Sequence, residues 1–324
     1  MIAGQALSEW LNDRTAQAAT LDRLIGVRAA WYENGKLDTL TARLDATDGD
    51  HAEVAAVARD LVKDDRLPRH FLATMLGGLS ADSFFTPPLR HMPGTVGHGV
   101  RLFSHRYLTL SLVMLDSDTL TAKKQAGSAG RSIVFTGKLA LRRILRAGGA
   151  AIERFAAEAA GQDFCLAEQP PCRPAGCEPL ADGDLLEVDG RTESFTFLQA
   201  GSAIAFLECE VLAGGAPFRV EYDAESLEAV AASSTNEAAS RCQLMLSALR
   251  ALDGAPATPL YDTLLADRSF EVRWHTIREL MRVDPSQAWP RLRKMAASDG
   301  NREVRAAASR VVAAQADRRA ACHA

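Results

Sequence analysis

The sequence of 324 residues lacks most of the short motifs that would assign a chemistry directly. It has no run of about 18 apolar residues, so we expect no membrane-spanning helix. Its start lacks a basic segment followed by an apolar block, so we expect no secretory signal. There is no G-x-S-x-G nucleophile motif, no G-x-x-x-x-G-K-[ST] order and no G-x-G-x-x-G after a strand. These absences give no support for an esterase-type serine, a P-loop or a dinucleotide site.

Cysteine pairs with C-x-x-C spacing are also absent, although the chain has six cysteines. Only Cys165, Cys172 and Cys177 cluster, in a proline-rich stretch with no histidine nearby. The favoured interpretation is free thiols in a reduced cytoplasm, and the alternative is a disulfide or a metal clip on a loop.

What is present is ordinary globular composition, with 47% hydrophobic and 24% charged residues. The length suits two or three domains. The net charge of −4 gives no general attraction to nucleic acid. Only the last third carries more Lys and Arg than Asp and Glu, and nearly all of its positive charge is arginine.

Residues 1–90 are predicted to form an N-terminal helical region. Apolar residues recur at helical spacing, as in Val54, Val57, Ala58 and Leu61. Asp48 or Asp50 is expected to cap that helix, because an aspartate accepts hydrogen bonds from the first free N–H groups.

Residues 91–234 change to a two-residue period, most clearly over 107–114. Several further short runs rich in β-branched and aromatic residues are separated by Asp-Gly and Gly-Gly turns. The pattern predicts an antiparallel β-roll, barrel or sandwich, so the fold class is α+β with several domains.

Three segments of this region, LRRILRAGGAAIERF, LADGDLLEVDGR and SAIAFLECEV, resemble the cupin β-roll over about 98–233. The turn at Gly183–Asp184 is similar to the turn that opens that family's second motif. Cupin enzymes hold a metal with an H-x-H pair, a glutamate and a further histidine. This sequence has no H-x-H and no histidine between His105 and His275. We therefore expect a cupin-like roll with no metal and no other cofactor.

Residues 235–324 contain the frame D-x-x-x-E-V-R twice, from Asp267 to Arg273 and, 32 residues later, from Asp299 to Arg305. Arg241 falls in the same register without the rest of the frame. The interval and the V-R pair resemble HEAT-type repeats, which implies an α-solenoid of stacked helix pairs. Each aspartate is expected to cap a helix, and the arginines are expected to pair with the aspartates of a neighbouring repeat.

Four charged residues are candidate ligand-binding groups in the roll. Arg142 and Arg146 share one strand parity, and so do Glu208 and Glu210. They either line a polar interior that binds a small polar ligand or form cross-strand ion pairs on the wet face.

The sequence offers two other candidate sites. His98, His105 and Glu153 are the residues that a non-haem iron site would need, although a separation of seven positions places the two histidines on opposite faces of a regular strand. The segment KKQAGSAGRS either cradles a phosphate or is a solvated loop.

The combined prediction is a cytoplasmic, non-catalytic protein that senses a small ligand, binds another protein through its C-terminal helices, or does both. One alternative is a metal-dependent β-roll enzyme. A second is nucleic-acid binding through the C-terminal basic residues, against which the interspersed carboxylates count. Those residues are Arg268, Arg278, Arg282, Arg291, Arg293, Lys294, Arg302 and Arg310.

Overall fold

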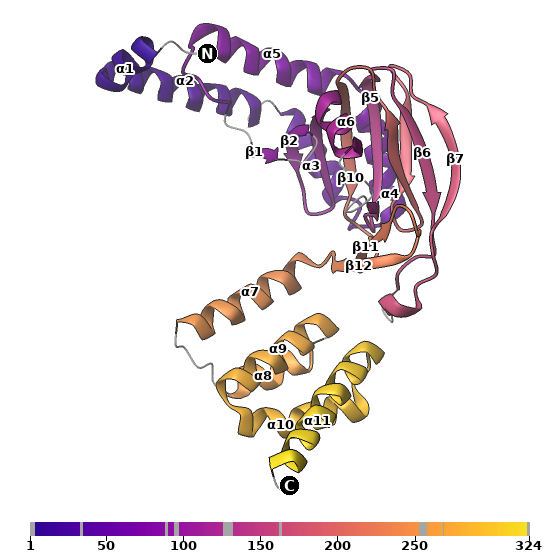
Figure 1. The fold of residues 1–324 in the computed structure, drawn as a ribbon. Helices are drawn as coiled ribbons and strands as arrows, with labels where there is room; N and C mark the ends of the chain where they lie inside the picture. The colour runs from indigo at the N-terminus through magenta and orange to yellow at the C-terminus, as the bar shows by residue number, and fades with distance from the viewer. Residues whose placement is uncertain are drawn as a thin grey trace. The chain divides into compact units, whose positions relative to one another are not determined.

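The chain divides into two compact units in a computed structural model (Figure 1). The structure describes residues 4–32, 35–87, 90–93, 97–125, 132–161, 164–252, 258–267 and 269–322. The first unit contains residues 1–157, 172–215 and 223–226, and the second contains 158–171, 216–222 and 227–324. The central residues of the predicted phosphate-cradling segment and Arg268 lie outside the described residues.

The first unit begins with the helices that the sequence predicts. They are α1 Gly4–Asn12, α2 Arg14–Tyr32, α3 Lys36–Asp45, α4 His51–Lys63 and α5 Arg66–Ala81, and a later helix, α6 Ser117–Gln125, was not predicted. Asp50 caps α4, because its Oδ1 accepts the Glu53 N–H at 2.9 Å. Asp48 is not the cap.

The strands of the first unit form antiparallel sheets. The larger sheet has the order β1-β2-β3-β10-β5-β8, with bounds Arg90–Pro93, Gly97–Ser104, Leu108–Leu115, Ile204–Val211, Leu139–Arg146 and Leu185–Asp189. The smaller sheet has the order β7-β6-β9, with bounds Arg173–Pro179, Ala151–Ala156 and Glu193–Gln199. Strand β4 (Ser132–Phe135) lies beside β9, where the Ser194 hydroxyl donates to the Val134 carbonyl at 2.6 Å. This unit is therefore α+β.

The prediction of a barrel is wrong for the described residues, because β1 and β8 end the larger sheet without meeting. The alternation of apolar and polar residues along a strand indicates which face of the strand is buried. It does not indicate whether the sheet closes into a barrel. Strand β7 was also missed, since its prolines predicted a loop. Pro174 and Pro179 are tolerated there because β7 is an edge strand.

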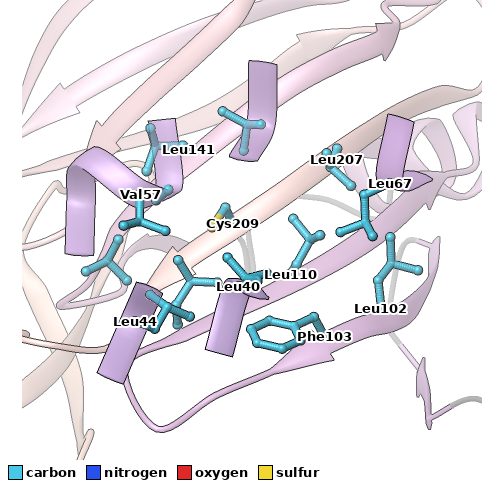
Figure 2. Close-up of a cluster of buried hydrophobic side chains, with 14 of the residues drawn as sticks. Leu40, Leu44, Val57, Leu67, Leu102, Phe103, Leu110, Leu141, Leu207 and Cys209 are labelled. Carbon is cyan, nitrogen blue, oxygen red and sulfur yellow. The ribbon is translucent and has the colours of Figure 1, made fainter. Parts of the chain in front are cut away.

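One face of the larger sheet packs against the N-terminal helices. Helix α4 lies against β5 and β10 (Figure 1). Figure 2 shows the resulting core, in which Leu44 and Val57 from helices meet Leu110, Leu141 and Leu207 from strands. Fully burying one such side chain contributes about 1.5–3 kcal/mol, so this core anchors the sheet.

The other face of the larger sheet packs on the smaller sheet. Along β10, Leu207 and Val211 belong to the helix-side core, whereas Ile204 and Phe206 belong to a second core with Ile152 of β6. Both faces of β10 are therefore covered. This two-sided burial explains why its sequence IAFLEC is apolar on both parities.

The second unit is mainly helical. It contains α7 Glu237–Ala251, α8 Thr258–Leu265, α9 Phe270–Val283, α10 Pro285–Ser298, α11 Arg302–Cys322, a short 3-10 helix η1 Leu166–Glu168 and the antiparallel strands β11 Phe218–Asp223 and β12 Ala229–Ser234. Helices α7 to α11 share a core that includes Leu246, Ile277, Leu292 and Ala308. Two apolar residues of α7, Leu244 and Leu252, are 71% and 81% exposed. In neither unit do the described helices include one whose length and hydropathy would let it cross a bilayer.

The repeated frame gives the same local geometry twice. Asp267 accepts the N–H of Ser269 at 2.7 Å, and Asp299 accepts the N–H of Asn301 at 2.8 Å. The aspartates thus brace the residue before each helix. The prediction that they cap the helices directly is wrong, because Asn301 itself accepts the Val304 N–H at the start of α11.

The predicted pairing between repeats is confirmed once. Arg273 donates two hydrogen bonds to Asp299, at 3.0 and 2.6 Å. Arg241 does not extend this ladder, because it pairs with Glu237 of its own helix at 2.8 Å. The assignment to HEAT-type repeats stays a prediction.

Candidate functional site

A half-open cavity of about 240 Å³ lies in the first unit, between the larger sheet and strands β9 and β4. Its walls come from β5, β8 and β10 on one side and from the start of β9 on the other. The lining residues are Val134, Thr136, Ala140, Arg142, Val188, Gly190, Glu193, Ser194, Phe195, Phe197, Phe206 and Glu208. The cavity therefore combines aromatic surface with both signs of charge.

Arg142 and Glu208 form the polar centre of this cavity. They are direct cross-strand neighbours on β5 and β10, and the Arg142 guanidinium lies 2.6 Å from the Glu208 carboxylate. Their side chains are only 13% and 15% exposed. Both predicted ligand groups thus meet, as an ion pair largely shielded from solvent.

Aromatic rings hold the Arg142 side chain in place. Its guanidinium carbon lies 5.1 Å from the ring centre of Phe195 and 6.0 Å from that of Phe206. Phe195 also contacts Phe197 edge-on, with ring centres 5.4 Å apart. A cation over aromatic faces is stabilised electrostatically, so the rings add to the Glu208 ion pair in holding the guanidinium.

The other two predicted ligand residues lie elsewhere. A β-bulge at Leu145 places Arg146 opposite Ala205, while Ile144 stays opposite Phe206. The bulge reverses the alternation, so Arg146 leaves the face that Arg142 occupies. Glu210 keeps the parity of Glu208, but it lies farther along β10 and does not line the cavity.

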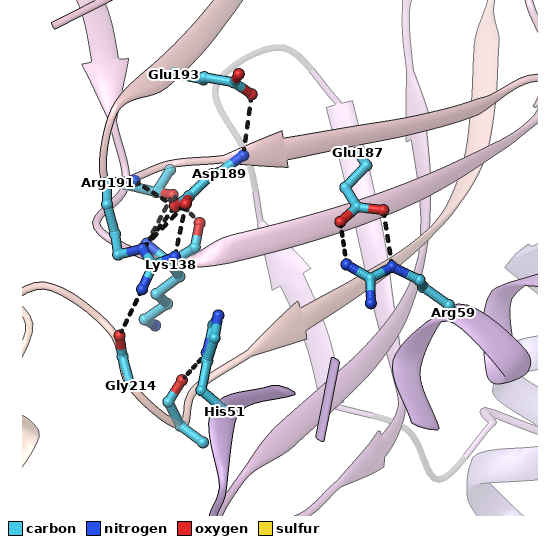
Figure 3. Close-up of polar contacts among 10 residues, drawn as sticks. His51, Arg59, Lys138, Glu187, Asp189, Arg191, Glu193 and Gly214 are labelled. Atoms are coloured by element: carbon cyan, nitrogen blue, oxygen red, sulfur yellow. Dashed lines mark hydrogen bonds and ion pairs between the residues drawn. The ribbon is translucent and has the colours of Figure 1, made fainter. Parts of the chain in front are cut away.

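A polar cluster orders the turn from β8 to β9, which is followed by the cavity residue Glu193 (Figure 3). Glu193 accepts the Asp189 N–H at 3.3 Å. Asp189 also accepts two hydrogen bonds from the Arg191 guanidinium, at 2.8 and 2.7 Å. These bonds lower the pKa of the Asp189 carboxyl against the opposing effect of burial, so the pair is charged at neutral pH.

Strand β8, which forms part of the cavity wall, is joined to helix α4 by an ion pair. Arg59 of α4 donates to both carboxylate oxygens of Glu187 on β8, at 3.0 and 2.5 Å. The hydrogen bond from Arg59 lowers the pKa of Glu187 and raises that of Arg59. This bidentate contact fixes the wall strand β8 relative to α4 (Figure 3).

The candidate iron ligands are not brought together. His98 lies near the start of β2, and His105 lies in the turn after it, where its Nε2 is 3.3 Å from Asp45. Glu153 lies on β6 of the other sheet, opposite Cys177 and Thr196. Across the part of the chain that the structure describes, no group of three His, Cys, Asp or Glu side chains is placed to hold a metal.

The clustered cysteines form no disulfide. Cys165, Cys172 and Cys177 are all free thiols. The alternative of a disulfide clip is therefore wrong for these residues, and the favoured interpretation of free thiols is consistent with the structure.

Several of the C-terminal arginines described are paired with carboxylates. Arg282 pairs with Glu279, which also binds Arg250. Arg291 pairs with Asp262, and Arg302 pairs with Glu168. These pairs reduce the positive charge that is available to a phosphate backbone.

Comparisons with known proteins give a limited result. No family model matches the chain, and no curated protein does. Solved structures that resemble part of it include ectoine synthase from P. lautus, at 12% identity over 37% of this chain and 67% of that one, with a TM-score of 0.23. A cupin 2 conserved barrel domain protein from Rhodopseudomonas palustris matches at 12% identity over 51% and 85%, with a TM-score of 0.25.

The 7S globulin of Momordica charantia matches at 7% identity and a TM-score of 0.26, over 41% of this chain. The chain spans only about a third of that protein, at 35% of its length. The structural neighbours thus include cupin proteins. At these TM-scores the similarity carries no functional argument, which has to come from the cavity itself.

Sequence reasoning missed the aromatic part of the site. Phe195 and Phe197 alternate in ESFTFL, a pattern that places both rings on one face of a strand. Phe206 has the parity of Glu208. Those signals were available, but the position of β9 across the cavity from β5 and β10 was not.

Proposed function

We propose that the first unit is a non-catalytic binding module for a compact zwitterion that carries an apolar body. The observation that carries this proposal is the Arg142–Glu208 ion pair on the wall of a phenylalanine-lined cavity. The ligand class follows from charge, shape and size.

Charge favours a ligand with both signs. A lone anion at Arg142 would compete with Glu208, and a lone cation at Glu208 would lie beside Arg142. A zwitterion can place its carboxylate on Arg142 and its ammonium on Glu208 or Glu193, so that no charge is left unpaired. Buried charges are stable only when paired, which makes this arrangement the least costly.

Size and lining favour an apolar body. A volume of about 240 Å³ is small compared with drug-sized pockets of roughly 300–1,000 Å³. Phe195, Phe197 and Phe206 supply the apolar wall. An aliphatic amino acid of leucine size has both charges and an apolar side chain of suitable dimensions.

Thermal-shift titration of the full chain with leucine, isocaproate and isopentylamine tests the proposal. Isocaproate and isopentylamine each retain one of the two charges. We expect leucine to raise the melting temperature of the wild type, and neither single-charge analogue to do so. The stabilisation should be lost in Glu208→Gln and in Arg142→Met. Equal stabilisation by all three compounds, or none by a panel of aliphatic and aromatic amino acids, would contradict a zwitterion site.

We further propose that residues 235–324 form a HEAT-like array that binds another protein. The support is the repeated frame, in which Arg273 of the first copy contacts Asp299 of the second copy. Cross-linking of the full chain to a captured partner through Lys294, which is exposed on α10, tests this. Cross-links confined to the first unit would contradict it.

A further inference from the structure

Helices α9 and α11 border a groove within the second unit. A hollow of about 630 Å³ is lined by both helices, with contributions from α7 and from the segment around η1. A second hollow of about 280 Å³ shares Trp274 and Arg278 with the first. We call the two hollows together the α9–α11 groove.

The groove has an apolar floor. In the smaller hollow, Trp274, Ile277, Met281 and Leu292 are joined by Val311, which is 39% exposed. A half-buried tryptophan between two hollows is the kind of anchor on which binding surfaces depend. A helical array uses such a groove to bind the apolar face of an amphipathic segment.

Two arginines stand at equivalent positions along this groove. Arg278 on α9 and Arg310 on α11 occupy the same place in the repeat, 32 residues apart. Both are exposed, and neither makes an ion pair with a residue that the structure describes. Their neighbours Arg282 and Arg302 are both held by carboxylates. Arg278 and Arg310 are therefore the cations that remain for a ligand.

At the other end of the groove, a carboxylate already accepts a hydrogen bond from the backbone of η1. The Glu303 carboxylate, in the first turn of α11, accepts the Leu166 N–H at 2.7 Å. Glu271 is the equivalent residue of α9 and lines the same hollow. On each helix the arginine follows its glutamate by seven residues, about 10 Å along the axis. Both helices thus present a carboxylate at one end and a cation at the other.

We propose that the α9–α11 groove binds an acidic amphipathic segment of a partner protein. Its carboxylates pair with Arg278 and Arg310, and its apolar face covers Trp274, Met281 and Val311. This inference rests on the proposed protein-binding function of residues 235–324. A nucleic acid fits less well, because its continuous line of phosphates would also meet Glu271 and Glu303, whereas a peptide can place its carboxylates beside the two arginines alone.

The test uses the full chain and two fluorescent peptides of about four helical turns, which are identical except that one carries glutamates where the other carries lysines. We expect the acidic peptide to bind and the basic one not to. Arg278→Glu/Arg310→Glu should weaken binding of the acidic peptide by about ten-fold or more, since two ion pairs become repulsions. Arg293→Glu, an exposed change on α10 that lies outside the groove, should alter binding less than about two-fold.

Three outcomes would overturn the inference. The first is equal binding of both peptides. The second is an unchanged affinity of Arg278→Glu/Arg310→Glu for the acidic peptide. The third is salt-dependent binding of duplex DNA that this variant loses. Trp274→Ala keeps both arginines and gives an independent check. It should weaken binding of the acidic peptide while leaving the circular dichroism spectrum of the chain unchanged. If the inference fails while partner cross-links still map to Lys294, the protein-binding proposal stands and only the groove is wrong.

Discussion

Arg273 and Asp299 lie 26 residues apart and form a bidentate ion pair that links α9 to the turn before α11. Their side chains are 14% and 5% exposed. Arg273 also donates to the Asp267 carbonyl at 2.9 Å, so one guanidinium joins two successive frames. The two copies of the sequence frame are therefore in direct contact.

Removing the cation should destabilise the second unit strongly. Arg273→Met leaves the Asp299 carboxylate buried without its main partner, and breaking such a pair costs about 3–5 kcal/mol. Arg291→Met is the matched control, because its partner Asp262 is 54% exposed, and it should cost under about 1 kcal/mol. Urea unfolding followed by tryptophan fluorescence measures both. Similar losses in the two variants would show that the Arg273–Asp299 pair has no special role.

The same pair predicts a pH dependence. Burial by itself would raise the pKa of Asp299, but hydrogen bonds from Arg273 and Asn301 and the charges of Arg273 and Arg305 outweigh it, so the pKa is lowered from 3.8. At pH values around 3.8, the folded state therefore binds fewer protons than the unfolded state. The stabilisation is fully present above about pH 4 and is lost as the pH falls through the folded pKa.

Wild type and Asp299→Asn should therefore differ by a constant free energy of unfolding between about pH 7 and 5, and the difference should shrink below about pH 4. Urea titrations at a series of pH values measure it. A difference that grows on acidification would contradict the lowered pKa.

The turn between β5 and β6 offers a paired backbone test. Gly148 and Gly149 both have positive φ, at 62° and 69°. A Cβ at Gly148 would lie 2.5 Å from the Ser202 carbonyl oxygen, whereas a Cβ at Gly149 would meet no atom within 4 Å. Gly149→Ala should cost about 1–2 kcal/mol from the dihedral alone, and Gly148→Ala should cost clearly more. Equal losses in the melting temperature would mean that the close approach to Ser202 is relieved at no cost.

Thiol reactivity should separate the clustered cysteines. Burial raises the pKa of Cys172 to about 11, while Cys177 is exposed on the edge strand β7. Because the thiolate is the nucleophile, Cys177 should react quickly with an aromatic disulfide at pH 8 and Cys172 only on unfolding. Cys177→Ser should remove one fast-reacting thiol and Cys172→Ser none. The reverse result would place Cys172 at the surface.

Local patterns predicted the elements well, because each depends on a few neighbouring residues. The helical stripe around Val54 and the alternation over 107–114 both gave the observed element type. Strand β7 failed because Pro174 and Pro179 normally exclude a strand, and only its edge position makes them acceptable. Edge position and sheet closure are properties of the whole sheet, which a local window does not contain.

Two of the four predicted ligand residues line the cavity. Parity brought Arg142 and Glu208 to one face, because no irregularity interrupts the pairing between them. Arg146 was lost to a bulge at Leu145, and nothing in LRRILR marks that bulge. Phe195 was missed because its contact with Arg142 joins strands more than 50 residues apart.

The most direct test of the zwitterion site is calorimetric titration of leucine into the wild type, Ala140→Leu and Ala140→Ser. Ala140 is buried on β5 and lines the cavity beside Arg142. The larger side chain fills the cavity while leaving both charges in place, and serine keeps the cavity open. We predict one bound leucine per chain for the wild type and for Ala140→Ser, and none for Ala140→Leu. Undiminished binding to Ala140→Leu would contradict a ligand site between the two sheets.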